Sequence, residues 1–214
     1  MPLSPPVARE KLHTRAITVT GYQREDGFYD IEAQLTDTKT YPFENDDRGR
    51  IDPGEALHGM WMRLTVNEDK VIQSCEAATD YSPYAICPQA APNFARLAGL
   101  RIQAGFLKAA NERVGGPVGC THLRELLQQM ATVVIQTINP ARARRQMLAE
   151  KAAGKADGPG LEERITAGHG GARHILNTCL AYGTDSPVIA RRWPELYTGP
   201  REEPETVAPQ AAAR

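Results

Sequence analysis

Apolar and polar residues alternate along two stretches in the first third of the chain. The first stretch, HTRAITVTGYQREDGFYDIEAQLTDTK at residues 13–39, is interrupted by the polar turn REDG. The second stretch, HGMWMRLTVNEDKVIQSC at residues 58–75, is interrupted by NEDK. A period of two on either side of a short polar turn is typical of a β-hairpin. We therefore predict two hairpins, joined by a polar loop punctuated by glycine and proline.

Apolar residues recur with helical spacing in the second half of the chain. The longest such stretch is residues 121–138, which we expect to stop at Asn139 because Pro140 disfavours helix at the residue before it. A basic helix is expected to follow it, and shorter helices are expected elsewhere. Their ranges are 92–100, 102–111, 141–152 and 172–183. Strands first and helices afterwards predict an α+β fold, with an antiparallel sheet from the N-terminal hairpins packed against the C-terminal helices.

Composition divides the chain into five predicted parts. Residues 1–12 are rich in proline and residues 200–214 follow the last apolar segment, so both are expected to be disordered. Residues 13–153 form the predicted α+β domain. Residues 154–171 are glycine-rich and read as a flexible linker, and residues 172–199 read as a C-terminal helix with an extended, packed tail.

The charge balance excludes one class of function. The 214 residues include 25 Lys and Arg and 26 Asp and Glu, for a net charge of −1, whereas a nucleic-acid-binding protein needs a basic face. No run of apolar residues is long enough to span a membrane, and the N-terminus lacks the apolar core of a secretory signal. We therefore expect a cytoplasmic protein that contacts neither nucleic acid nor membrane, and whose cysteines are reduced.

Candidate metal ligands lie at the ends of the predicted elements. His58 precedes a strand, Cys87 follows the second hairpin, and Cys120 with His122 opens the long helix in the motif GCTHL. Rigid elements can position side chains at their ends, and a helix N-terminus favours the thiolate form that binds metal. The plainer interpretations are a buried thiol for Cys87 and a surface histidine for His58.

The two remaining cysteines are expected to have a structural role. Cys75 lies in a predicted strand and Cys179 in a predicted amphipathic segment, so both are expected in the core. The sequence leaves open whether Cys179 supports the metal site.

The order of these groups resembles the iron–sulfur cluster scaffold fold of the NifU and IscU type. In that family a cysteine precedes a strand of the form C-G-D-x-M-[KR]-L, a second follows the hairpin, and a third begins a long helix. Here HGMWMRL places His58 at the first position and Met60 in place of the aspartate, while Cys87 and Cys120 match the others. The resemblance implies an IscU-like fold, but the two replacements make a transferable cluster less favoured than a single ion.

The chain also resembles, over most of its length, a bacterial family known only as a domain of unknown function, number twenty-eight eighty-nine. The stretches that carry this resemblance are REDGFYDIEAQLTDTKTY, HGMWMRLTV, GCTHLRELL and RRWPELYTG. The family has no settled activity, so the resemblance names relatives without implying a reaction.

We predict that His58, Cys87 and Cys120 bind zinc or iron, a donor set that suits both metals. Three protein ligands with one open position are typical of a catalytic site, and four are typical of a structural one. On a regular helix, positions 120 and 122 point about 200° apart. His122 is therefore expected to be a helix cap, an outer partner of the metal or an acid–base group, although the sequence leaves its coordination open.

The predicted function is a metal-binding protein, most simply a small zinc- or iron-dependent hydrolase or lyase that acts on a small apolar or aromatic carbonyl or acyl compound. His122 and Asp37 are the candidates for proton transfer. The candidate substrate-binding residues are Trp61, Met60, Tyr84 and Lys39. The alternatives are a non-catalytic carrier that hands a metal ion or an iron–sulfur cluster to a partner protein, and a structural zinc site. A homo-oligomer is compatible with the sequence.

Overall fold

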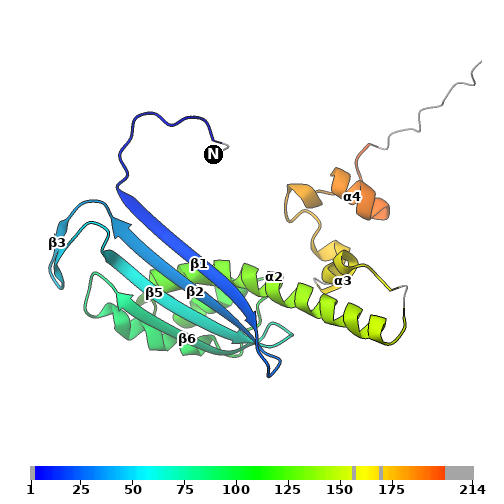
Figure 1. Ribbon diagram of the computed structural model, residues 1–214, viewed down its shortest axis with the longest axis horizontal. Coiled ribbons are helices and arrows are strands. Elements are labelled where there is room, and N and C mark those ends of the chain that lie inside the picture. The colour runs from blue at the N-terminus through cyan, green and yellow to red at the C-terminus, as the bar shows by residue number, and fades with distance from the viewer. Residues whose placement is uncertain (1–2, 156–157, 169–170, 201–214) are drawn as a thin grey trace, which may run out of the picture. The chain divides into compact units, whose positions relative to one another are not determined.

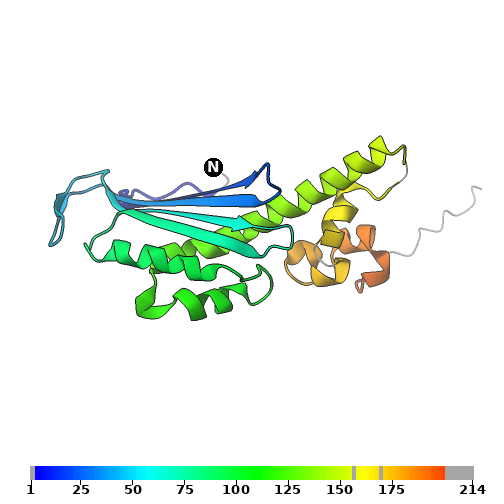
Figure 2. The same cartoon turned by 90° about the horizontal axis from the view of Figure 1, so that it is seen from below.

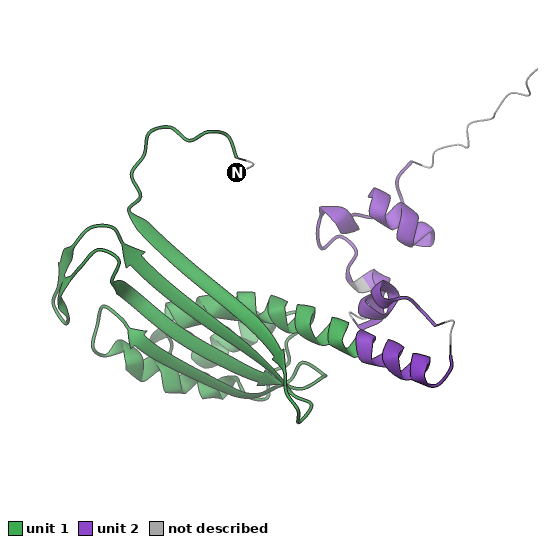
Figure 3. Cartoon of the chain, in the orientation of Figure 1, with its two compact units in different colours: residues 1–142 green, residues 143–214 purple. Residues whose placement is uncertain are grey.

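The computed structural model describes residues 3–155, 158–168 and 171–200. The chain divides into two compact units, residues 1–142 and 143–214 (Figure 3). The expected domain boundary at residue 153 lies eleven residues beyond this division (153 − 142). Residues 3–12 contain no helix or strand, and the predicted disordered tail lies outside the described residues except for Pro200.

The first unit is built on a four-stranded antiparallel sheet with the strand order β1-β2-β5-β6 (Figure 1). Its strands are β1 (His13–Gln23), β2 (Tyr29–Lys39), β5 (Ala56–Val66) and β6 (Ile72–Tyr81). Both predicted hairpins are confirmed. Gly27 closes the first turn with φ +88°, a conformation that only glycine adopts easily.

A small second sheet occupies the loop predicted between the hairpins. It consists of β3 (Phe43–Asn45) and β4 (Gly49–Ile51). The side-chain oxygen of Asn45 accepts hydrogen bonds from the backbone N–H groups of Asp47 and Arg48, which stabilises the turn. Three-residue strands are too short to show alternation, so the sequence pattern did not predict them.

One face of the four-stranded sheet is covered by helices (Figure 2). These are the 3-10 helix η1 (Cys87–Leu97), α1 (Phe106–Val114), a short 3-10 turn η2 (Gly116–Val118) and α2 (Thr121–Ala152). Apolar side chains of the strands and of η1, α1 and α2 form one core. The α+β fold is therefore confirmed. No helix among the described residues is long and apolar enough to cross a membrane.

Helix α2 runs through Pro140, where we expected it to stop and restart. Proline has no N–H to bond the carbonyl of Gln136, so one helical hydrogen bond is lost. Ile138 and Ala143, on either side of this point, are 0% and 2% exposed. Burial on both sides stabilises the continuous helix, and tertiary packing here overrides the local preference.

The second unit contains short elements that differ from the prediction. They are α3 (Leu161–Gly168), η3 (Ala172–His174), η4 (Leu180–Tyr182), α4 (Pro187–Arg192) and η5 (Pro194–Leu196). The helix predicted over 172–183 is replaced by two 3-10 turns, and Asn177 between them has φ +57°. The predicted extended tail instead contains α4, whose start is capped by Ser186 accepting from the N–H of Ile189.

Replacing Gly21 with alanine is expected to lower the free energy of unfolding by about 1–3 kcal/mol. A Cβ at Gly21 would lie 2.0 Å from Oγ1 and 3.0 Å from Cβ of Thr137, so β1 and α2 would have to separate. Urea denaturation of G21A, T137A and the double variant measures this contact. We expect T137A to recover part of the loss, and additive effects would contradict the packing described here.

Candidate functional site

Strand alternation places Asp37 at the end of an apolar row. Every second side chain of β2 points to the helix-covered face, and the first four of this row are Tyr29, Ile31, Ala33 and Leu35. Asp37 comes next in the row and its side chain is 1% exposed. The strand register puts Arg15 of β1 and His58 of β5 directly beside it. The three side chains therefore project from neighbouring strands on one face of the sheet.

Asp37 accepts hydrogen bonds from Arg15 and His58, and the ring of His13 lies within ion-pair distance of it. Arg15 donates from Nε to Oδ1 at 2.8 Å and from Nη2 to Oδ2 at 2.7 Å. His58 Nδ1 lies 2.9 Å from Oδ2, and His13 Nε2 lies 3.2 Å from Oδ1. Burial by itself would raise the pKa of Asp37, but the hydrogen bonds and charge of Arg15, helped by His58, lower it below its ordinary value. Asp37 is therefore a carboxylate at neutral pH.

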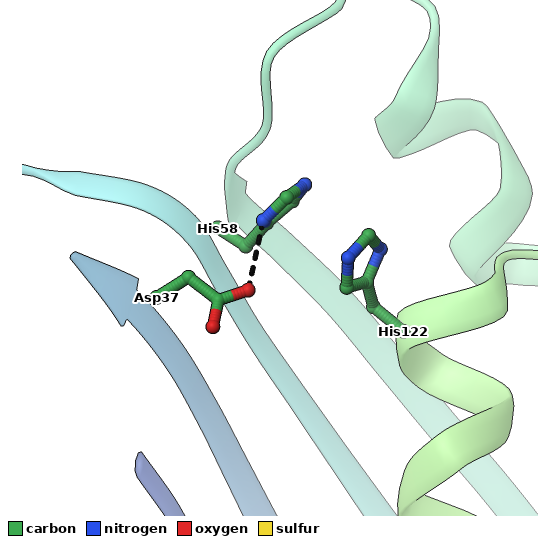
Figure 4. A group of neighbouring side chains, drawn as sticks. All are labelled: Asp37, His58 and His122. Carbon is green, nitrogen blue, oxygen red and sulfur yellow. Dashed lines mark hydrogen bonds and ion pairs between the residues drawn. The ribbon is translucent and has the colours of Figure 1, made fainter. Parts of the chain in front are cut away.

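His122 reaches the same place from the first turn of α2. Its ring lies against that of His58, with ring centroids 3.8 Å apart and planes inclined by 31° (Figure 4). One potential ligand atom from each of Asp37, His58 and His122 lies within 4.8 Å of the other two. Within the described part of the chain, this is the group of His, Cys, Asp and Glu side chains that meets the distance requirement for a metal site.

A second ion pair ties the strand side of the site to the helix. Arg15 Nη1 donates to Glu125 Oε2, and Glu125 lies three residues after His122 on α2. The chain of contacts from Glu125 through Arg15 to Asp37 therefore holds the start of α2 against the sheet. Sequence reasoning missed Arg15, His13 and Glu125, although the first hairpin turn already implies that Arg15 pairs with Asp37.

Both histidines of the group are neutral at neutral pH. Burial lowers the pKa of His58, and the neighbouring His122 lowers it further, against the opposing effect of Asp37. Burial also lowers the pKa of His122, and the charge of Arg15 adds to this. A carboxylate can only accept, so Nδ1 of His58 carries the proton and Nε2 has a free lone pair.

Acidification is expected to destabilise the protein below about pH 6.5. His58 and His122 have folded-state pKa values below the ordinary 6.5 to which they return on unfolding, so protons bind preferentially to the unfolded chain. The contribution of the two neutral histidines to the free energy of unfolding is fully present above pH 6.5 and is lost as the pH falls. Asp37 adds a further loss below its ordinary pKa of 3.8. Urea denaturation with a chelator present, from about pH 7 to pH 5, measures the effect. The free energy of unfolding of the variant H58Q/H122Q should fall less over this pH range. An equal fall in the variant and the native protein would show that other groups cause the pH dependence.

The structure does not bring together the predicted ligand set of His58, Cys87 and Cys120. Sγ of Cys120 lies 3.9 Å from Sδ of Met60 and packs against the core, while Cys87 begins η1; neither belongs to the group at His58. Cys120 directly precedes α2 and its thiol is directed to Met60 and the core, whereas His122 in the first turn of α2 is directed to His58. When Cys120 faces the core, His122 faces the site, so the histidine takes the place that we expected for the cysteine.

The residues predicted to bind substrate do not line one pocket either. Met60 is 1% exposed in the core, whereas the next residue, Trp61, is 44% exposed on the other face of β5, so they cannot line one pocket. Trp61 donates from Nε1 to Asp80 at 2.8 Å and borders a groove of about 290 Å³ with residues of β2, β5 and β6. Tyr84 is exposed in the loop after β6.

Lys39 lies two residues after Asp37 and therefore on the same face of β2. Its ammonium group donates to the hydroxyl of Tyr41 at 3.1 Å and lies 5.2 Å and 5.9 Å from the ring centroids of Tyr41 and Phe43. Lys39 and these two rings form a cationic and aromatic edge where β2 ends.

The other two cysteines differ in their surroundings. Cys75 is buried as predicted, and burial raises the pKa of its thiol to about 12, so it is not a nucleophile at neutral pH. Cys179 is exposed rather than in the core. The helix that would have buried it does not form.

Comparison with known proteins gives a family but no reaction. No curated protein and no solved structure matches the chain, so the resemblance to the iron–sulfur scaffold fold stays a prediction. The profile of a family described as "Protein of unknown function (DUF2889)" matches residues 13–136. This range contains the whole group at Asp37 together with His13, Arg15 and Glu125. The chain therefore belongs to the DUF2889 family, as the resemblance implied, although one of the four stretches quoted for it, RRWPELYTG, lies outside the matched residues.

Proposed function

We propose that this protein binds one divalent metal ion, zinc or ferrous iron, at Asp37, His58 and His122. The observation that carries the proposal is the convergence of three potential ligand atoms within 4.8 Å from two strands and one helix. Two imidazoles and a carboxylate are the donor set of catalytic zinc sites and of non-haem iron oxygenases. Both imidazoles are neutral at neutral pH, which is the form that binds metal.

Asp37 and His58 already face one another without an ion, with Oδ2 of Asp37 2.9 Å from Nδ1 of His58. An ion held by both side chains would replace the proton between these two atoms, so Nδ1 would be the ligand atom of His58. The bidentate pair with Arg15 keeps the carboxylate in place whether or not an ion is bound.

Three protein ligands leave coordination positions for water and substrate, so the proposed site is catalytic rather than structural. A bound ion there would polarise a carbonyl or activate water, as in a hydrolase or lyase. We place a small aromatic or apolar carbonyl or acyl compound against the edge formed by Lys39, Tyr41 and Phe43, because the rings can pack against its apolar part and the ammonium group can donate to its carbonyl oxygen. The side chain of His13 is 43% exposed, which supports access from solvent on this side.

The alternative of an iron–sulfur cluster carrier has less support. Clusters of this kind are held mainly by thiolates. Within the described residues, the group that meets the distance requirement contains no cysteine. We therefore favour a single ion held by nitrogen and oxygen donors.

Elemental analysis of protein purified without a metal-affinity tag tests the proposal. We expect about one zinc or iron per chain, because one group of ligands is present. The variants C87S and C120S should keep this metal, since neither thiol belongs to the group. Absence of metal after incubation with zinc and with ferrous iron, or loss of metal in either cysteine variant, would overturn the assignment of the site.

A further inference from the structure

Strand β1 is an edge of the four-stranded sheet. Its eleven residues pair with β2 on one side, and no other described strand pairs with its second side. An edge of this length presents a row of backbone N–H and C=O groups that can pair with another strand. Proteins usually protect such edges with proline, lysine, a bulge or a short strand. β1 contains no proline or lysine, and its pairing with β2 is regular throughout.

The side chains of β1 also lack the charges that would prevent pairing. On the face away from the helices the strand presents Thr14, Ala16, Thr18, Thr20 and Tyr22, none of them charged. Arg15 is the one Arg, Lys, Asp or Glu of this strand, and it is held on the other face by Asp37 and Glu125.

Two apolar side chains are incompletely covered at this edge. Ile17 and Val19 point to the helix-covered face and pack against the core, but both are only partly buried. A strand added outside β1 would cover their outer sides, because cross-strand neighbours on one face lie in contact.

We propose that two copies of this chain pair through β1, antiparallel to one another, about a two-fold axis at Thr18. This register pairs all eleven residues, from His13 opposite the partner's Gln23 to Gln23 opposite the partner's His13. It places Ile17 against the partner's Val19 and Thr18 against the partner's Thr18. A two-fold axis perpendicular to the sheet keeps the helices of both copies on the same face.

The second copy is the occupant that the strand itself favours. In this register Arg15 lies opposite the partner's Gly21, so no two like charges meet. Thr18 faces the partner's Thr18, Thr20 faces the partner's Ala16, and Thr14 faces the partner's Tyr22. Pairs of β-branched residues and of threonines stabilise antiparallel strands. A strand from a different protein would need uncharged, small or β-branched residues at the same positions to pair with β1 equally well.

Light scattering coupled to size-exclusion chromatography of the full chain tests the proposal. We expect twice the chain mass of 23.4 kDa for the native protein. T18K and T18E should each halve the measured mass, because position 18 faces itself across the axis and like charges opposite one another are destabilising. An equimolar mixture of T18K and T18E should restore the dimer, because opposite charges then meet. S74K is the matched control, since Ser74 is exposed on the same face but belongs to β6, and it should remain a dimer.

A second measurement keeps the test valid if the charged variants fold poorly. T18C should form a disulfide-linked dimer under mild oxidation, and the native protein shows how much arises from the four natural cysteines. A native protein that is monomeric at all concentrations overturns the proposal. A dimer that T18K and T18E leave intact, together with no additional cross-linking of T18C, places the interface elsewhere and also overturns it.

Discussion

Replacing Asp37 with asparagine is expected to lower the free energy of unfolding by about 3 kcal/mol. The substitution removes the charge that compensates Arg15 and turns one accepting oxygen into a donor that faces Arg15 or His58. Breaking a buried ion pair costs about 3–5 kcal/mol, and we expect the lower end because the side chain of Arg15 is 32% exposed. Urea denaturation at neutral pH measures the change.

Glu125→Gln is the matched control for D37N. It removes the other carboxylate partner of Arg15, but the side chain of Glu125 is 47% exposed, so the loss is expected to stay below about 1 kcal/mol. Equal effects of D37N and E125Q would show that Asp37 is not the centre of the network. The comparison is independent of metal if both proteins are measured with a chelator.

Replacing His122 with alanine is expected to weaken zinc binding more than 100-fold, roughly the upper limit for removal of an outer partner of a metal ligand. The variant loses one of two imidazole donors while the contacts among Arg15, Asp37 and His58 persist. H58A should have an effect of the same size. Isothermal titration calorimetry with zinc alone, on chelator-treated protein, measures both.

His13→Ala is the control for these two variants. His13 touches Asp37 but is not a member of the group, so we expect at most the 10- to 100-fold effect of an outer partner. If H122A binds zinc with the affinity of the native protein, His122 is not a ligand of the metal. Equal losses in all three histidine variants would point to a general disturbance of the sheet end instead.

The main features of the fold could be predicted because they are local. Alternation and the turns REDG and NEDK indicated the four long strands, and the spacing of Leu123, Leu127 and Val134 indicated the long helix. The sequence did not show that α2 continues through Pro140, because the burial that stabilises it there comes from the tertiary structure. A capping serine followed by proline at residues 186 and 187 was a usable signal for α4 that we did not interpret.

The site was predicted only in part, for geometric reasons. Asp37, His58 and His122 were all recognised as candidates, but their meeting depends on the pairing of β2 with β5 across the small hairpin β3–β4. No local pattern gives that register. Whether Cys120 or His122 is directed to the site depends on which side of α2 faces the core. The helical spacing of Leu123, Leu126 and Leu127 indicates that side and could have decided between them.

The division of the chain at residue 142 has a consequence for how proteins of this family can vary. Every side chain of the network, from His13 to Glu125, precedes the division, and the family match ends at residue 136, six residues before it (142 − 136). A member of the family whose chain differs after residue 142 could therefore keep every donor atom of this network.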